Sequence, residues 1–164
     1  GLSRGDLGRS LLTERAVNDD IRETFAATFE LVLMTITIAF VLGVPLGVAA
    51  ARWKDRWPDT LVRILAIFSA VTPSFFAALL LQILAGYVLH ILPTTGRLPH
   101  NLEFVAQITG LLTIDSLLAG RLDVFGEALR HLLLPATALA LATMGQIARI
   151  TRSSMRNIQS SKST

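Results

Sequence analysis

Cysteine is absent from this 164-residue sequence, and charged residues are scarce, at 16%. Without cysteine there is no disulfide framework, no thiolate nucleophile and no cysteine-ligated metal. A typical soluble domain carries about 25% charged residues, whereas here hydrophobic residues make up 52% and the mean hydropathy is +0.56. So short a chain cannot enclose that much apolar surface in one core. The composition excludes a disordered or disulfide-rich protein and indicates a membrane protein.

Motifs for common catalytic and nucleotide-binding sites are also missing. The sequence contains no P-loop, no G-x-S-x-G elbow and no H-E-x-x-H helix. Three histidines, His90, His100 and His131, lack the i,i+4 spacing of a metal-binding helix, so we expect them to lie at the membrane interface without a metal. The net charge is only +3, which favours a lipid bilayer over nucleic acid as partner. We therefore expect neither an enzyme nor a cofactor in this chain.

Long uncharged runs indicate the architecture. Residues 31–51, 64–96 and 131–148 carry no charge, and a membrane-spanning helix needs roughly 20 mainly apolar residues. We expect an all-α integral membrane fold with three transmembrane helices, at about residues 25–51, 61–89 and 132–150. A fourth uncharged run, residues 104–114, is too short to span and predicts an interfacial or re-entrant helix at about 102–114.

The distribution of charge predicts the orientation. Residues 1–25 and the long connection between the second and third spans contain more acidic than basic residues, whereas the first loop (52–63) and the tail after residue 148 contain more basic residues. Lysine and arginine mark cytoplasmic loops. We therefore expect the first loop and the C-terminus to be cytoplasmic, and the segment 1–23 and the connection 92–131 to be external.

Small residues recur every fourth position in two of the spans. One row is Ala39, Gly43, Gly47 and Ala51, and the other is Ala66, Ala70, Ser74 and Ala78. Such rows let helix backbones approach closely in lipid, although alanine and glycine are common in membrane helices generally. Pro45 and Pro73 each remove a helical hydrogen bond and predict a kink, while Pro135 falls in the first turn of the third expected span, where proline is tolerated.

Several polar residues fall within or beside the spans. Glu30 is either a functional carboxylate in the membrane or, as we expect from its position near the end of the span, a side chain that reaches water at the external headgroups. Thr37, Gln82 and Gln146 are further candidates for the lining of a pathway. Arg149, Arg152 and Arg156 form one basic helix face, which we expect to anchor the chain to anionic lipid.

Seven segments resemble motifs of the permease subunits of dipeptide, oligopeptide and nickel ABC importers. They occur along the chain in the same order as in that family. They are GDLGRS (5–10), ATFEL (27–31), LGVPLGV (42–48), PSFF (73–76), LPTTGR (92–97), HLLLPA (131–136) and RSSM (152–155). The resemblance implies a type I (MetI-like) transmembrane domain that works by alternating access. It also implies a homologous permease, two cytoplasmic ATPases that hold ATP and magnesium, and an external substrate-binding protein as partners.

The same resemblance places the three spans as the second, third and fourth helices of the family. Residues 24–164 would then be a partial permease domain, and we expect an incomplete chain that does not transport by itself. It does not decide between a dipeptide, an oligopeptide and nickel as substrate. Two other classes remain open: a fragment of a secondary transporter, which would call for charges near mid-membrane, and a membrane scaffold without a pathway.

Overall fold

The computed structural model describes residues 7–10, 13–98, 102 and 108–161, and the regular elements in this part of the chain are helices, apart from one β-bridge between Arg9 and Ala16. The helices are α1 (Val17–Arg52), α2 (Trp57–Val71), α3 (Ser74–Leu81), the π-helix η2 (Gln82–Val88), α4 (Leu112–Leu118) and α5 (Leu122–Ser161). The expected all-helical class is confirmed.

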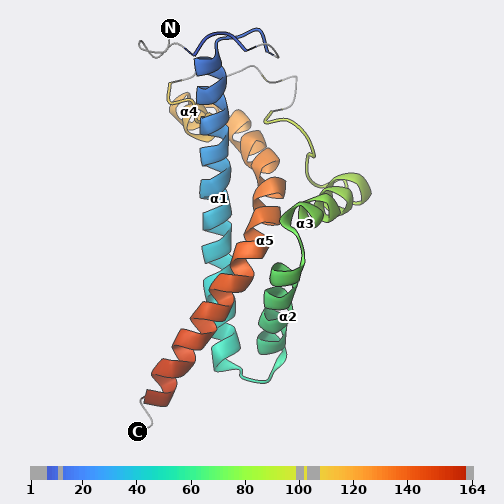
Figure 1. The fold of residues 1–164 in the computed structure, drawn as a ribbon, viewed down its shortest axis with the longest axis vertical. Coiled ribbons are helices and arrows are strands. Elements are labelled where there is room, and N and C mark those ends of the chain that lie inside the picture. The colour runs from blue at the N-terminus through green and yellow to red at the C-terminus, as the bar shows by residue number, and fades with distance from the viewer. Residues whose placement is uncertain (1–6, 11–12, 99–101, 103–107, 162–164) are drawn as a thin grey trace.

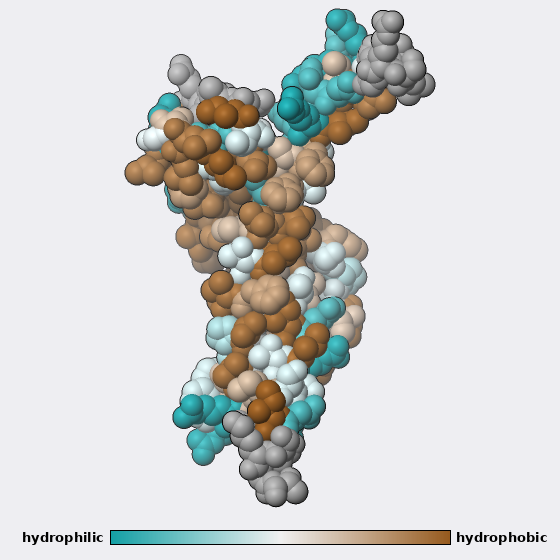
Figure 2. Space-filling view, turned by 90° about the vertical axis from the view of Figure 1, so that its left-hand side faces the viewer, coloured by the Kyte–Doolittle hydropathy of each residue, from teal (hydrophilic) through white to brown (hydrophobic). Residues whose placement is uncertain are grey.

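Two long helices form the frame of the molecule. α1 and α5 pack against each other and run in the same direction, while α2 returns in the opposite direction beside α5 (Figure 1). Residues Val17–Arg52 and Leu122–Ile158 are long and apolar enough to cross a membrane. In the view of Figure 2, apolar residues cover the middle of the molecule and hydrophilic residues gather toward its two ends. This distribution fits a bilayer around the middle.

The second expected span is a broken helix. α2 ends at Val71, and the following helical stretch Ser74–Val88 is bent from it by 113°. Pro73 is the physical cause, because its ring removes an N–H donor and disfavours helical backbone at the residue before it; Thr72 accordingly has ψ 121°. α2 and the stretch Ser74–Val88 together make one candidate span that is bent at Pro73, where the sequence predicts a kink.

The third expected span is longer than the sequence indicated. α5 begins at Leu122, so Pro135 lies well inside a 40-residue helix and not in its first turn. The residues before 132 are charged on one side only, because Val124 and Ala128 are fully buried while Asp123 and Arg130 are exposed. This amphipathic stretch continues the helix beyond the apolar span. α1 likewise begins at Val17, and it continues through Pro45 to Arg52.

The interfacial helix expected at about residues 102–114 lies partly outside the described part of the chain. Residues 108–111 are not helical, residues 103–107 lie outside the described part of the chain, and α4 occupies Leu112–Leu118. Gly110 has φ +83°, a left-handed conformation that glycine adopts without strain and that separates the preceding loop from the helix. In the described part of the uncharged run, residues 108–111 form a loop and residues 112–114 begin α4.

Candidate functional site

The most extensive helix contact among the described residues is the seam between α1 and α5. The predicted small-residue row on α1, Ala39, Gly43, Gly47 and Ala51, is buried throughout. Ala140, Met144 and Ala148 of α5 are buried with this face. This face of α1 lies against α5, and the seam is made by backbones that approach each other where α1 carries no large side chain.

Two glycines show how tight this seam is. A Cβ atom added to Gly47 would lie 2.6 Å from both the backbone oxygen of Ala148 and the Cβ of Thr151, while one added to Gly43 would lie 3.2 Å from the nearest atoms, on Ile147 and Met144. A third contact of this kind joins α5 to α2, because a Cβ added to Gly145 would lie 2.6 Å from Ser69 Oγ. Only glycine fits at Gly47 without displacement of the neighbouring helix.

The second predicted row does not form a buried face. Ala70 and Ser74 are exposed and Ala66 and Ala78 are half-buried, so the packing prediction for this row was wrong. The break at Pro73 interrupts the row, and α2 turns another face, with Val62, Leu65 and Ser69, toward α5. A four-residue repeat places residues on one face only while the helix remains continuous.

A buried carboxylate lies near the end of the seam that contains the N-terminus of α1. Glu30 is 6% exposed. Its Oε2 accepts a hydrogen bond of 2.7 Å from Arg97 Nη2, and its Oε1 accepts bonds of 2.7 Å from the backbone N–H and the Oγ1 of Thr113. The expectation that Glu30 reaches water was wrong, because partners 67 and 83 residues away in the sequence surround its carboxylate.

The segment that carries Arg97 is held from three directions. Gln82 Nε2 donates to the backbone oxygen of Thr94 at 3.3 Å, and the His131 ring lies 3.1 Å from the backbone oxygen of Gly96. Together with the bond to Glu30, these contacts fasten residues 94–97 to η2, α5 and α1. The predicted pathway candidate Gln82 is thus half-buried and engaged with the backbone of this segment.

Two cavities adjoin Glu30. One, of about 190 Å³, is lined by Phe29, Glu30, Leu33, Thr37 and residues of α4 and α5, and the other, of about 170 Å³, by Glu30, Arg97, His131 and their neighbours. Thr37 lines the first cavity, and its hydroxyl donates to the backbone oxygen of Leu33. The structure thereby brings Glu30 and Thr37 to the lining of one cavity.

Asp115 organises the loop before α4. Its carboxylate accepts hydrogen bonds from the backbone N–H groups of Ile108, Thr109 and Gly110, at 2.8–3.2 Å, and from Thr109 Oγ1 at 2.7 Å. Burial by itself raises the pKa of this carboxyl group, but the four hydrogen bonds outweigh it, so the pKa of Asp115 lies below its usual value of 3.8. The ionised carboxylate therefore stabilises this loop.

We expect the loop to loosen in acid. Because the pKa of Asp115 is lower in the folded state, its stabilising contribution is complete above pH 3.8 and is lost as the pH falls through the folded-state pKa. Hydrogen exchange of the Thr109 and Gly110 amides should show constant protection above that pH and a decline below it. Asp115→Asn should show weaker protection at neutral pH and no such decline. Wild-type protection that persists in strong acid would contradict this assignment.

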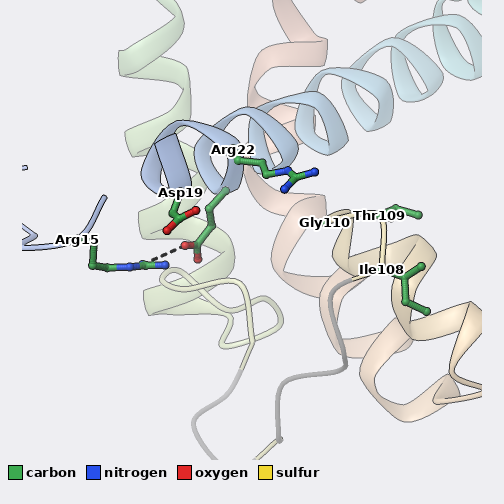
Figure 3. A pocket seen from close by; sticks show the side chains of 7 residues that line it. Arg15, Asp19, Arg22, Ile108, Thr109 and Gly110 are labelled. Carbon is green, nitrogen blue, oxygen red and sulfur yellow. Dashed lines mark hydrogen bonds and ion pairs between the residues drawn. The ribbon is translucent and has the colours of Figure 1, made fainter. Parts of the chain in front are cut away.

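A second charged hollow lies beside the start of α1. Arg15, Asp19, Arg22 and Glu23 face Thr109 and its neighbours across a cavity of about 220 Å³ (Figure 3). Arg15 Nη1 and Glu23 Oε2 form an ion pair of 3.1 Å within it. Local sequence patterns do not predict this cavity, because Thr109 is remote from α1 in the sequence.

The opposite end of the seam holds a fully buried aspartate. Asp59, in the first turn of α2, is 0% exposed. Its Oδ2 accepts hydrogen bonds from Arg63 Nη2 at 2.7 Å, from Arg152 Nη2 at 3.0 Å and from the backbone N–H of Asp55 at 3.1 Å. Arg152 Nε also contacts Asp59 Oδ1. Sequence reasoning missed this cluster, because Asp59 and Arg152 lie in separate charged segments.

The predicted basic face is divided by this cluster. Arg149 is exposed, Arg156 is half-buried, and the Arg152 side chain is only 18% exposed. The expectation that all three arginines anchor to lipid was wrong for Arg152, which pairs with a buried carboxylate of the same chain. Among the remaining candidates, Gln146, Pro45, Pro73 and Ser74 are exposed, so the structure does not bring them into the clusters described above.

Metal-ligating side chains do not gather in the described part of the chain, where no group of three histidine, aspartate or glutamate residues could hold an ion. His90 lies beside the loop at residues 91–98, His131 contacts Gly96, and His100 lies outside the described residues. The polar clusters are therefore ion pairs and hydrogen bonds between protein groups.

Comparison with known proteins identifies one family and several relatives, all named as transport components. Residues 43–162 match the family described as binding-protein-dependent transport system inner membrane component. A probable D,D-dipeptide transport system permease protein of Escherichia coli is 44% identical over 94% of the chain and 45% of its own length. A dipeptide transport system permease protein of Alkalihalophilus pseudofirmus is 35% identical over 96% of the chain and 47% of its own length.

A third relative carries a different name. A putrescine export system permease protein of Escherichia coli is 32% identical over 93% of the chain and 48% of its own length. The chain spans about half the length of the curated relatives it matches. The region that matches the family, residues 43–162, contains the C-terminal part of α1, all of α2 and α5, and both partners of the buried Asp59–Arg152 pair.

Proposed function

Because this chain belongs to the family of binding-protein-dependent transport system inner membrane components, we propose that it forms part of the membrane-spanning permease of an ATP-driven importer for short peptides. The observation that carries the proposal is the 44% identity, over nearly the whole chain, to a permease named for D,D-dipeptides. Transport would proceed by alternating access, in which the helices expose the pathway to one side of the membrane at a time.

The proposed partners follow from the family name and the fold. We propose that a homologous permease completes the pathway, that two cytoplasmic ATPases bind ATP and magnesium, and that an external binding protein delivers the peptide. The exposed apolar side chains on the outward faces of α1 and α2, such as Phe40 and Ile67, would contact lipid or the second permease. Family membership favours this role over a secondary transporter or a scaffold.

We propose different roles for the two ion-pair clusters at the ends of the α1–α5 seam. Glu30 and Arg97 would hold the external segment 94–97 against α1 and α4, whereas Asp59 and Arg152 would hold α2 against α5 on the cytoplasmic side. The α1–α5 seam at Gly43 and Gly47 would keep the two helices together during transport. The pathway candidates Thr37 and Gln82 would lie on the external half.

A chimera tests the function. The segment of the Escherichia coli D,D-dipeptide permease that matches this chain is replaced by residues 1–164, and ATP-dependent uptake of a labelled D,D-dipeptide is measured in vesicles. We expect uptake well above that of vesicles without permease. The same chimera with Gly47→Leu should lose it, because the seam cannot close around the larger side chain. A chimera that assembles with its ATPase but transports no peptide would overturn the proposal.

Sidedness is tested with single cysteines, because the chain has none of its own. We expect Lys54→Cys, in the exposed loop between α1 and α2, to react with an impermeant maleimide only from the cytoplasmic side, because this loop is rich in arginine and lysine. Ala119→Cys, exposed after α4, should react only from outside. The reverse pattern would invert the orientation, and reaction of both from one side would contradict the topology.

A further inference from the structure

We propose that Asp59 is a positioning residue that holds the cytoplasmic ends of α1, α2 and α5 together as one rigid unit, through its ion pair with Arg152. The inference rests on the proposed transport function, because it concerns how movement at one end of α5 reaches the other helices. It goes beyond that function in assigning a mechanical role to a specific pair of residues.

Because Asp59 is buried, its ion pair with Arg152 restricts how α2 and α5 can move past each other. A carboxylate that is 0% exposed has no access to water, so its charge must be met by protein groups. Arg63 is on the same helix, but Arg152 lies on α5 and presents Nη2 and Nε to the two carboxylate oxygens. A slide of α5 by one turn would carry Arg152 about 5.4 Å away and leave the buried charge without this partner. The pair therefore fixes the register of α2 against α5.

Packing at the same level includes α1 in the unit. Arg152 follows Thr151, whose Cβ lies against Gly47 of α1 at the tightest point of the seam. Ala50, Val62 and Ala148, one from each helix, form a buried apolar cluster beside it. The three helices are thus joined by an ion pair, a backbone contact and an apolar contact, all near the level of Arg152.

The unit ends where α2 ends. Pro73 breaks the helix, and the stretch Ser74–Val88 leaves at 113°, with most of its large apolar side chains exposed. No such clamp joins α2 to α3 across this break in the described residues, where α3 begins with Ser74 exposed. Movement that reaches the cytoplasmic end of α5 would therefore be passed to α1 and α2 as a body, with the flexible point at Thr72 and Pro73.

Spin labels in the assembled transporter test this inference. Thr60→Cys on α2 and Ile158→Cys on α5, both exposed, are labelled in the otherwise cysteine-free chain, and the distance between them is measured with and without a non-hydrolysable ATP analogue. In the labelled parent protein, in which Asp59 and Arg152 are unchanged, we expect one distance distribution that nucleotide does not shift. In Asp59→Asn, we expect nucleotide to shift or broaden it beyond the width of the parent distribution.

Asp55→Asn is the matched control. Asp55 is also an aspartate bonded to Arg63, at 3.0 Å, but its side chain is 65% exposed and does not contact Arg152. We expect it to behave like the parent protein. Arg152→Gln should reproduce the effect of Asp59→Asn, and the double variant should add nothing, because both changes remove the same contact.

The outcomes separate this inference from the proposed function. A shift of the parent distance with nucleotide, or an unshifted distance in Asp59→Asn, overturns the rigid unit. If Asp59→Asn does not assemble, Arg152→Lys is used; it keeps the charge but loses the planar fork, and an unshifted distance in that variant overturns the inference. Absence of peptide uptake by the parent transporter, with the expected distances, overturns the proposed substrate and leaves the rigid unit supported.

Discussion

Gly47→Ala is expected to destabilise the protein by about 3 kcal/mol, at the upper end of the range for overpacked positions. The added methyl group would lie 2.6 Å from the backbone oxygen of Ala148 and 2.6 Å from the Cβ of Thr151. Neither is the far end of a flexible side chain, so α1 and α5 would have to separate along the seam. Because Arg152 is the next residue, the separation should also disturb its ion pair with Asp59.

Two other glycines provide a graded comparison. At Gly43 the nearest atoms lie 3.2 Å away, and at Gly126, also in a helix, no atom lies within 4 Å. We expect Gly43→Ala to cost less than Gly47→Ala, and Gly126→Ala to be neutral or to stabilise α5 by up to about 1 kcal/mol. Unfolding in mixed detergent micelles, followed by helical circular dichroism, measures all three. Equal stability of the three variants would show that the seam is looser than the structure has it.

Glu30→Ala should also be damaging, with an expected cost of about 1–3 kcal/mol, typical of leaving buried hydrogen-bond donors without an acceptor. The change leaves the guanidinium of Arg97 and the N–H of Thr113 without their acceptor. We expect faster hydrogen exchange at the Thr113 amide and a lower unfolding midpoint. The segment 94–97 should loosen with it, because among the described residues it would keep the bonds to Gln82 and His131 but lose the bond to α1.

The control for this effect is a carboxylate at the surface. Glu23, on the same helix, pairs with Arg15, but its side chain is 40% exposed, so Glu23→Ala should cost less than about 1 kcal/mol. The double change of Glu30 and Arg97 to alanine should cost less than the sum of the two single changes, since it removes the unpaired charge. Strict additivity of the two changes would mean that the pair is not coupled.

Local sequence patterns predicted the parts of the fold that local patterns determine. The four-residue row on α1 lies on one buried face, because Ala39, Gly43 and Gly47 belong to one uninterrupted helix. The same reasoning failed for Ala66, Ala70 and Ser74, since the backbone turns sharply at Pro73 and a repeat cannot continue through a break. Pro73 predicts a kink, but a local pattern does not predict its angle of 113°.

The polar clusters could not be predicted in the same way. Glu30 was recognised as a candidate, yet its partners Arg97 and Thr113 lie in segments whose placement depends on the whole fold. Asp59 and Arg152 were counted only as charges that set orientation, and nothing within either segment indicates that they meet. Charge also misplaces the start of α5, because Arg130 bounds the uncharged run although the helix begins before it, at Leu122.

The distance between the two ion pairs along the seam is close to the thickness of a membrane. Glu30 and Gly47 are separated by 17 residues of α1, which corresponds to about 26 Å at 1.5 Å per residue, and Gly47 lies at the level of Arg152. The hydrocarbon layer of a bilayer is about 30 Å thick. The two buried ion pairs would therefore sit at its two boundaries, where a charge costs less than at the centre. Such a chain should be sensitive to bilayer thickness, since a much thicker layer would draw both ion pairs into hydrocarbon.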